Sequence, residues 1–595
     1  MEGQKFETTT LKKIVLMMTV IVFLFHVCSA ILCKRHYYAD GAYALVKLVN
    51  QQNELLPLSY DANTLRMGAE FINQLLVILC LKFGIRSIGF LSIVFGISLF
   101  FNSVVGMTLC WRKCRYLENG RNLILFPFAA YAFFCLPADI FSLNPAFTAF
   151  WIDMVLFFYI ISENKKTIDK LILGVLLILA ATSYETYLAI GPLLLLISLM
   201  EIKNQKQNPV KRKELIIISI GIVSGVIVNI LYKATHHPPT EGSFFTGFLS
   251  FLNNSKNILT SNLLISLVGL FLVVLGISKL LDKRWIWLSM AALGIIYIMV
   301  VRYYYHFYSP VSEYHCRILI AVGMAGGILL AYAYYRLYDT VIVKNICITN
   351  WWRAAIIVFV LQCVWQYGNT YEWNQYLTRF SETVRTNEGI IEDPHKENPF
   401  SWGWTQPSLS LLESEANRIN CLVAPNAYQI SVNNGVVYIP FLYINNDVFD
   451  MSTIIAYENN KFSAADCQNV SLSCDPQRDF TRENGNMELS VEIYNNGEKT
   501  LENKNLFASY HIYFNDERVV WDGPRVEIDQ NIAPGESYSI NVPIDDDFLS
   551  HYLLQEGNYS FVLDLVREHE YWFHDSGMQK TEITLHYRPA VIELK

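Results

Sequence analysis

Long apolar segments alternate with short polar ones through the first 370 residues of the chain. A helix needs ~20 apolar residues to cross roughly 30 Å of hydrocarbon, so segments near this length predict membrane spans. We interpret the first segment as a retained anchor rather than a signal peptide, because no small-residue cleavage motif ends it and further spans follow. The pattern predicts eleven spans, at 14–32, 88–111, 123–136, 147–161, 171–183, 187–200, 215–232, 258–281, 285–301, 318–335 and 354–367.

The segment 171–202 fits either one long helix or two short helices that fold back within "SYETYLAIGP". Charge distinguishes the two interpretations. "ENKK" precedes the segment and "KNQKQNPVKRK" follows it, and the positive-inside rule places both basic runs on the cytoplasmic side. Only a hairpin of two helices returns the chain to that side. With eleven spans, the N-terminus is predicted to be cytoplasmic and everything beyond about residue 370 extracytoplasmic.

The last third of the chain is polar, and its apolar positions follow a different period. Residues 371–485 show a helical pattern followed by short apolar strands, which predicts an extracytoplasmic α/β domain. From 486 to 595, the alternation in "MELSVEIYNNGEKTL" and the hairpin signal in "FASYHIYFNDERVVWDG" predict a β-sandwich. The predicted fold is therefore a polytopic α-helical membrane domain, residues 1–370, followed by these two domains.

Composition agrees with this division. Of 595 residues, 53% are hydrophobic and only 17% are charged, which is too apolar for one soluble globule. The net charge is −7 and no broad basic face is visible, which argues against a nucleic-acid partner. Cys467 and Cys474 lie in the polar part and would close a small disulfide loop in an oxidising compartment; the sequence alone leaves that pairing open.

Carboxylates gather on the predicted outer side of the membrane domain. Asp40 follows the first span, Asp139 follows the third, and Glu185 lies in the hairpin. Taken singly, Asp40 and Asp139 also fit ordinary interfacial residues. Taken together with Glu185, they predict an acid/base cluster. Glu185 has the alternative role of an ion-pair partner for Arg302 or Arg317.

The segment "RYYYHFYSPVSEYHCR" concentrates aromatic rings, histidines and two arginines at the predicted outer surface. One interpretation is an interfacial aromatic belt. The other is a phosphate site in which Arg302, His315 and Arg317 contact the anion, because a guanidinium keeps its charge and binds phosphate with two donors. Trp402 and Trp404 in "SWGWTQPSLS" either line a sugar path or pack their domain against the membrane.

Asp153 lies inside the fourth predicted span, on its outer half. A carboxylate at that depth is costly and usually faces a cavity or a partner, so we assign it to acceptor binding. The sequence contains no HExxH and no CxxC pair, and the adjacent histidines of "HHPP" seldom converge on one ion. The cofactor is unknown from the sequence, which neither requires nor excludes a divalent cation.

These features resemble the GT-C superfamily of polytopic membrane glycosyltransferases, which carry an acidic residue in the first external loop and a C-terminal extracytoplasmic domain. The resemblance implies a polyprenyl-phosphate-linked sugar donor, Asp40 as the catalytic base, and Asp139 in "PAD" as the second acidic position. Asp40 lacks the paired acidic residue that some members have. The C-terminal part, with its "PGE" turn, "LDLV" strand and "WF" before glycine, is similar to β-sandwich modules of bacterial surface-polysaccharide proteins.

The expected function is the transfer of a sugar to a glycan or lipid acceptor at the outer face of the bacterial plasma membrane. Two alternatives belong to other classes: a transporter or flippase of lipid-linked glycans, and a non-catalytic protein of polysaccharide assembly. A transporter is expected to show inverted repeats with charges at the midplane. The sequence shows neither.

The predicted topology is tested by labelling single cysteines introduced near residues 206, 240 and 400. A membrane-impermeant maleimide added from outside should label the sites near 240 and 400 and spare the site near 206, because the basic run there is predicted to be cytoplasmic. The parent chain, with its twelve native cysteines, sets the background. External labelling near residue 206 would contradict the hairpin.

Overall fold

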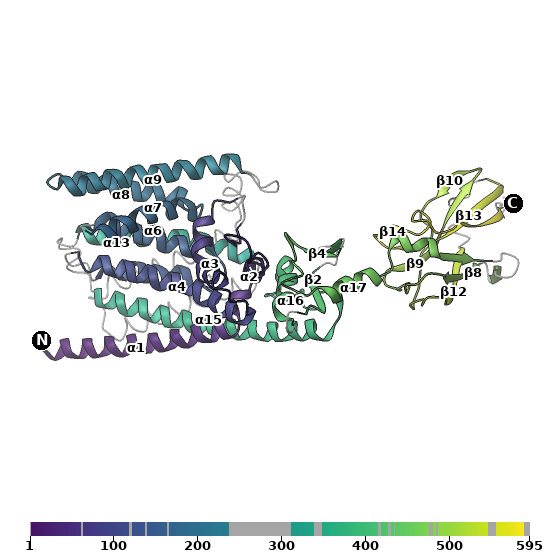
Figure 1. Cartoon of the computed structure of the whole chain (residues 1–595), viewed down its shortest axis with the longest axis horizontal. Coiled ribbons are helices and arrows are strands. Elements are labelled where there is room, and N and C mark those ends of the chain that lie inside the picture. Colours follow the sequence, from purple (N-terminus) through teal and green to yellow (C-terminus); the bar gives the residue numbers. More distant parts are fainter. Residues whose placement is uncertain are drawn as a thin grey trace, which may run out of the picture. The chain divides into compact units, whose positions relative to one another are not determined.

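The computed structural model divides the chain into two compact units, residues 1–454 and 455–595, which are described separately (Figure 1). The described residues are 2–60, 64–117, 122–136, 140–163, 166–236, 311–337, 348–414, 418–425, 430–433, 435–474, 480–483, 486–544, 552 and 555–587.

The first unit is built mainly from long helices that lie side by side with roughly parallel axes (Figure 1). Residue types at the helix starts explain several boundaries: Asn144 and Asn208 each cap a helix whose first residue is proline, and each side chain accepts a backbone N–H of the first turn. The helices are α1 (Glu2–Leu32), α2 (Asp40–Asn50), α3 (Met67–Lys82), α4 (Ile88–Cys114), α5 (Leu125–Ala130), which continues as the π-helix η3 (Tyr131–Cys135), α6 (Pro145–Ile161), α7 (Thr167–Ser183), α8 (Tyr187–Asn204), α9 (Pro209–Thr235), α13 (Val311–Leu337) and α15 (Ile348–Thr386).

Four helices of the described part of the chain are long and apolar enough to cross a membrane: Lys13–Leu32, Ile88–Cys114, Tyr187–Asn204 and Pro209–Thr235. Two shorter apolar helices, Leu125–Cys135 and Pro145–Ile161, accompany them. Helices also occupy the predicted spans at 171–183, 318–335 and 354–367. The predicted spans 258–281 and 285–301 lie outside the described residues. The described residues thus hold four helices that could span a membrane, fewer than the eleven spans predicted, which is consistent with a membrane protein.

The predicted hairpin at 171–202 is confirmed as two helices, α7 and α8, joined by residues 184–186. Two ion pairs connect helix ends that the basic runs also assign to the same side of the membrane. Arg112 of α4 pairs with Asp169 of α7 at 2.6 Å, and Arg336 of α13 pairs with Glu201 of α8. Each of these pairs joins positions that the charge pattern puts on one side of the membrane.

Two helices differ from the sequence prediction. α3 was not predicted, because Asn73 and Gln74 interrupt its apolar run; both side chains are buried and hydrogen-bonded, Asn73 to Thr148 of α6 and Gln74 to Ser59. α15 continues as one helix past residue 370, where a domain boundary was placed, because no proline interrupts 348–386.

Residues 389–454 complete the first unit with short elements. Asp393 is buried after the first strand and accepts hydrogen bonds from the His395 backbone N–H at 2.7 Å and the Ser401 hydroxyl at 3.0 Å, which fixes the loop that leads to α16. The strand β1 (Gly389–Glu392) pairs in parallel with β2 (Cys421–Ala424). The remaining elements are η5 (Gly403–Thr405), α16 (Gln406–Glu413) and the antiparallel β3 (Ser431–Asn433), β4 (Val436–Ile439) and β5 (Leu442–Tyr443).

The second unit is a sandwich of two antiparallel sheets. One sheet has β12 (Ser537–Ile544), β8 (Asn486–Asn495), β6 (Val470–Ser473) and β7 (Phe480–Glu483). The other has β10 (Glu517–Val520), β9 (Leu506–Phe514), β13 (Gly557–Arg567) and β14 (Tyr571–Trp572), with β11 (Val526–Glu527) and β15 (Thr581–Tyr587) at its margins. The alternating apolar side chains of β8, β9 and β13 form one core between the sheets.

Local sequence explains the connections of this unit. Asn515 and Asp516 both have positive φ, 50° and 64°, as a two-residue hairpin turn between β9 and β10 requires. β6 and β7 pair with β8 although they precede residue 486, so this sheet begins before the predicted boundary. The helix α17 (Ser452–Asn460) and η7 (Ala464–Asn469) lead into β6. Cys467 is a buried free thiol beside the Ser463 carbonyl, so the bridge to Cys474 is not formed.

Gly106 makes the crossing of α4 and α6 testable. A Cβ atom at this position would lie 2.7 Å from the Trp151 side chain, which is itself held by a 3.0 Å hydrogen bond from its indole N–H to Ser103. Gly106→Ala should therefore overpack the crossing at a cost of ~1–3 kcal/mol and lower the thermal unfolding midpoint in detergent. Gly89→Ala on the same helix meets nothing within 4 Å and should not. Equal midpoints for the two variants would contradict the close approach.

Candidate functional site

The chain turns sharply between α1 and α2, and Asp40 is the first residue of α2. Lys34 adopts a left-handed conformation, and Ala39 has φ 52° and ψ −127°, a region that residues with a Cβ seldom occupy. Such strain costs on the order of 1–3 kcal/mol and persists only where surrounding contacts enforce it. Gly41 is required, because a Cβ there would lie 1.8 Å from the His36 carbonyl oxygen.

His36 anchors this turn to α4. Its ring is buried, its Nε2 lies 2.9 Å from the Ser92 hydroxyl, and a Cβ on Gly96 would lie 2.8 Å from its Nδ1. Burial, together with the charge of Lys34, lowers the pKa of His36 to about 3. The imidazole is therefore neutral at physiological pH. It holds the turn in place and is not suited to exchange protons in a reaction.

Arg35 lies buried in a set of aromatic rings at the same turn. Its guanidinium carbon lies 4.6 Å from the Tyr38 ring centroid, 5.2 Å from that of Phe400 and 5.5 Å from that of Trp373. Cation–π contacts of this kind gain strength when they are desolvated. The rings come from the turn, from α15 and from the loop before η5. Trp402 extends the set, with its ring edge-to-face at 6.2 Å from Tyr38.

Residues 389–454 cover this end of the helical region. Lys34 forms a 2.6 Å ion pair with Glu413 of α16, whose side chain is only 4% exposed. Asn50 at the end of α2 donates to the Tyr443 carbonyl at 2.9 Å and accepts from the backbone N–H of Asn445 at 2.7 Å. Trp404, which the sequence predicts as a site residue, contacts Tyr43 of α2, with the two ring centroids 5.1 Å apart. Asp40, Trp402 and Trp404 are thus brought to one end of the first unit.

Glu185 has a defined structural partner. Arg66 donates to both of its carboxylate oxygens, at 3.0–3.3 Å, and Lys233 lies 3.6 Å away. Burial raises the pKa of Glu185, but the Arg66 guanidinium outweighs this effect, and the pKa ends below its ordinary value. The ion pair ties the α7–α8 turn to the start of α3. The described residues supply Arg66 and Lys233 as partners; the partners considered from the sequence, Arg302 and Arg317, have no described side chains, so that pairing stays a prediction.

Asp153 is buried in the middle of α6 and is 1% exposed. Among the described residues its Oδ1 has no hydrogen-bond partner, and neither does the hydroxyl of Tyr187, with which it interacts electrostatically. Buried polar atoms without a hydrogen-bond partner are rare in folded proteins. The acceptor-side role of Asp153 stays a prediction.

No protein-family model, curated protein or solved structure matches the chain. Among the residues that the structure describes, no group of three or more His, Cys, Asp and Glu side chains is placed to hold a metal ion.

Several predicted residues are not located by the structure. Asp139 and Arg302 lie outside the described residues, and His315 and Arg317 belong to α13 but their side chains are not described. The phosphate site thus stays a prediction. Sequence reasoning also missed Arg35, although the signal was present in "CKRHYYADG", where an arginine stands among tyrosines next to Asp40.

The Arg66–Glu185 pair is tested with a double-mutant cycle of Arg66→Gln and Glu185→Gln. Both side chains are largely buried, 26% and 12% exposed, so we expect a coupling of ~0.5–3 kcal/mol at pH 7 in thermal unfolding of the membrane-embedded chain. Because the folded-state pKa of Glu185 is lowered, the coupling is complete above the ordinary glutamate pKa of 4.5 and disappears as the pH falls through the folded value.

The exposed pair Lys396–Glu392 is the matched control. Both of its side chains are more than half exposed, so the same cycle should show little coupling at any pH. A coupling for Arg66–Glu185 no larger than that of the control, or one that grows on acidification, would contradict the assignment.

Proposed function

We propose that this chain is a GT-C-like membrane glycosyltransferase. It transfers a sugar from a polyprenyl-phosphate-linked donor to a glycan or lipid acceptor at the extracytoplasmic face of the bacterial plasma membrane. The chain crosses that membrane eleven times, with its N-terminus in the cytoplasm. No nucleotide donor is available outside, so a lipid-linked donor that arrives within the bilayer suits an enzyme embedded there.

The observation that carries the proposal is the position of Asp40. A carboxylate at the N-terminus of a helix is stabilised by the helix dipole, and this one follows a strained residue in a turn held by Arg35, His36 and Lys34. A merely interfacial aspartate needs no such support. Strained backbone that the surrounding structure enforces is concentrated at functional sites.

In the proposed reaction, Asp40 accepts the proton of the acceptor hydroxyl as its oxygen attacks the anomeric carbon of the sugar. The bond from that carbon to the phosphate oxygen breaks with inversion, and the polyprenyl phosphate leaves with the bonding electrons. Arg302, Arg317 and His315 stabilise the negative charge on the departing phosphate. No metal is needed for this balance of charge, and none is assumed.

The other residues act around this centre. Asp139 is the second acidic group and orients the acceptor. Glu185, held by Arg66 and Lys233, is a positioning residue that fixes the α7–α8 turn beside α3. Trp402 and Trp404 present aromatic surface for sugar rings near the N-terminal half of α2, and Asp153 provides a polar group within α6.

Asp40→Asn should reduce sugar transfer by ~10²–10⁴-fold, because the change removes the basicity of the side chain and keeps its size. The assay uses the full chain in lipid nanodiscs with undecaprenyl-phosphate-linked glucose, galactose, mannose and N-acetylglucosamine as donors, and follows label into glycan and glycolipid fractions. Binding of undecaprenyl phosphate, measured by titration, should stay close to that of the wild type.

Glu54→Gln is the matched control, because Glu54 is an exposed carboxylate on the connection between α2 and α3. Its transfer rate should be unchanged. Near-normal turnover in Asp40→Asn would exclude Asp40 as the base and move that role to Asp139 or Asp153. If both Asp40→Asn and Asp139→Asn retained transfer, a transporter or an assembly protein would be favoured over an enzyme.

A further inference from the structure

The β-sandwich buries charged groups on a sheet face that is normally exposed. In β9 and β13, the side chains that point into the core include Tyr510, Ile512 and Leu563. Because side chains alternate along a strand, His511 of β9 and Asp564 of β13 project from the opposite face. Both are nevertheless buried, 1% and 0% exposed at their side chains. Something on the outer face of this sheet must therefore cover them.

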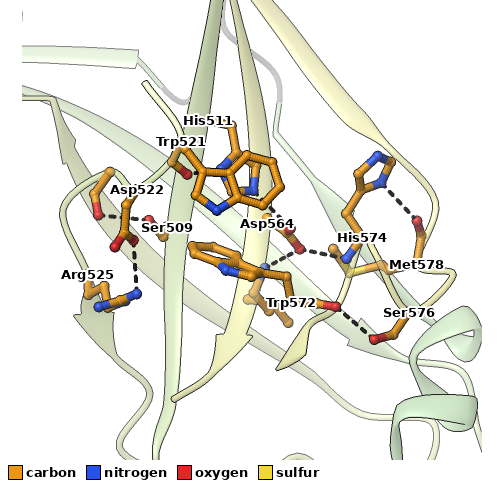
Figure 2. A network of polar contacts seen from close by, with 12 residues as sticks. Ser509, His511, Trp521, Asp522, Arg525, Asp564, Trp572, His574, Ser576 and Met578 are labelled. Atoms are coloured by element: carbon orange, nitrogen blue, oxygen red, sulfur yellow. Dashed lines mark hydrogen bonds and ion pairs between the residues drawn. The ribbon is translucent and has the colours of Figure 1, made fainter. Parts of the chain in front are cut away.

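The cover consists of two tryptophans from different segments (Figure 2). Trp521 follows β10 and stacks on the His511 ring at 4.4 Å with an interplanar angle of 17°. Trp572 belongs to β14 and approaches the same ring at 4.5 Å, tilted by 57°. The two indole centroids are 6.0 Å apart. Both tryptophans remain half-buried, so a part of each indole reaches the surface.

The buried pair fixes the positions of both tryptophans. His511 Nε2 lies 3.1 Å from Asp564 Oδ2, and His511 Nδ1 bonds to the Trp521 carbonyl oxygen. A carbonyl oxygen only accepts, so Nδ1 donates to it, and Nε2 faces the Asp564 carboxyl group. The other oxygen of Asp564 accepts the backbone N–H of His574 at 2.9 Å, two residues after Trp572.

Burying such a pair is costly and adds little net stability compared with an apolar pair of the same shape. A hydrophobic residue at each position would cover the sheet as well. Unlike an apolar pair, the polar pair forms directional hydrogen bonds, and these fix the positions of the Trp521 backbone and of the segment after Trp572. Rigid support beneath half-exposed aromatic residues is typical of binding sites, in which the contacting groups are held before the ligand arrives.

The rim of this surface mixes donors and acceptors. Arg518 lies over the Trp521 ring at 4.7 Å and Arg525 over the Trp572 ring at 5.7 Å. Arg525 is also paired with Asp522 at 2.9 Å and with Glu568 at 3.1 Å. The two guanidinium groups and two carboxylates balance in charge. This balance disfavours nucleic acid or another polyanion and suits an uncharged ligand rich in hydroxyl groups.

We propose that Trp521 and Trp572 form a binding surface for pyranose rings of a neutral glycan. The C–H bonds on one face of a pyranose point toward the electron-rich face of an indole, and the ring hydroxyls are left to bond with Asp522, Glu568 and the arginines. This inference goes beyond the proposed transferase activity and does not depend on it.

The test uses the full chain in nanodiscs that contain no glycoside detergent, because a maltoside headgroup would compete. Biotinylated dextran, mannan and galactan are the neutral probes, and hyaluronan is the acidic probe, each immobilised for biolayer interferometry. The wild type should bind at least one neutral polysaccharide. Trp521→Leu and Trp572→Leu should each weaken binding about tenfold or more, equivalent to ~1.4 kcal/mol, because tryptophans are enriched among the residues that carry most of the binding energy.

Tyr494→Leu is the control, because Tyr494 is a half-buried aromatic residue on β8 of the other sheet. Its binding should equal that of the wild type. The inference is overturned if the wild type binds none of the neutral probes, if only hyaluronan binds, or if both leucine variants bind as the control does.

The phenylalanine variants separate binding from folding. Trp521→Phe and Trp572→Phe keep an aromatic cover over His511 and lose part of the stacking area, so their affinities should fall between those of the wild type and the leucine variants. Thermal unfolding is measured alongside. If the leucine variants fail to fold, the phenylalanine variants decide: weaker binding at an unchanged unfolding midpoint supports the surface, and unchanged binding overturns it.

Discussion

The burial of the Arg35 guanidinium is the constraint on which the first unit depends. Removing such a charge from water is costly unless other groups compensate for the lost hydration. Tyr38, Phe400 and Trp373 supply aromatic faces for this purpose, and they come from three separate parts of the chain. These contacts form where the turn between α1 and α2, the helix α15 and the loop before η5 meet. The position of Asp40, five residues further on, is therefore set by contacts that are distant in sequence.

Both units use a buried charge beside aromatic rings, but with different consequences. In the first unit the rings enclose Arg35, and Trp373 is itself 1% exposed and bonded to the Cys33 carbonyl, so this set joins segments together. In the second unit the rings that cover His511 remain half-buried, so a part of each is open to solvent. The same interaction serves as an internal anchor in one case and as the base of an accessible surface in the other.

Periodicity was sufficient to predict most elements and insufficient to predict their partners. Eleven spans were predicted from apolar runs, and the nine that fall within the described residues are helical. The alternation of apolar and polar residues correctly predicted the strands β8, β9, β12 and β13. α3 was missed because Asn73 and Gln74 look unfavourable in an apolar run until their partners on other segments are known. A local pattern does not reveal which distant group will satisfy a polar side chain.

The candidate site shows the same limit. Asp40 was singled out from its place after an apolar segment, and in the structure it is the first residue of α2; its catalytic role stays a prediction. The partner of Glu185 was not predicted, because Arg66 is 119 residues away and lies in an unremarkable polar connection. His511 occupies an alternating position that normally faces water, so no signal in its own strand indicated that it would be buried.

The two neighbouring aromatic residues at 572–573 have different roles. Phe573 points into the sandwich core and stacks on Phe462 at 5.8 Å, while its neighbour Trp572 pairs with Val566 on the outer face. The apolar character of the pair is thus divided between stabilising the fold and forming a surface. A shift of the strand by one residue would exchange the two side chains, exposing the phenylalanine and forcing the larger indole into a closed core. The backbone N–H of Phe573 donates to the Leu565 carbonyl, and the backbone N–H of His574 donates to the Asp564 carboxylate; together they fix the register of this segment. The aromatic surface therefore depends on the same strand pairing that builds the core.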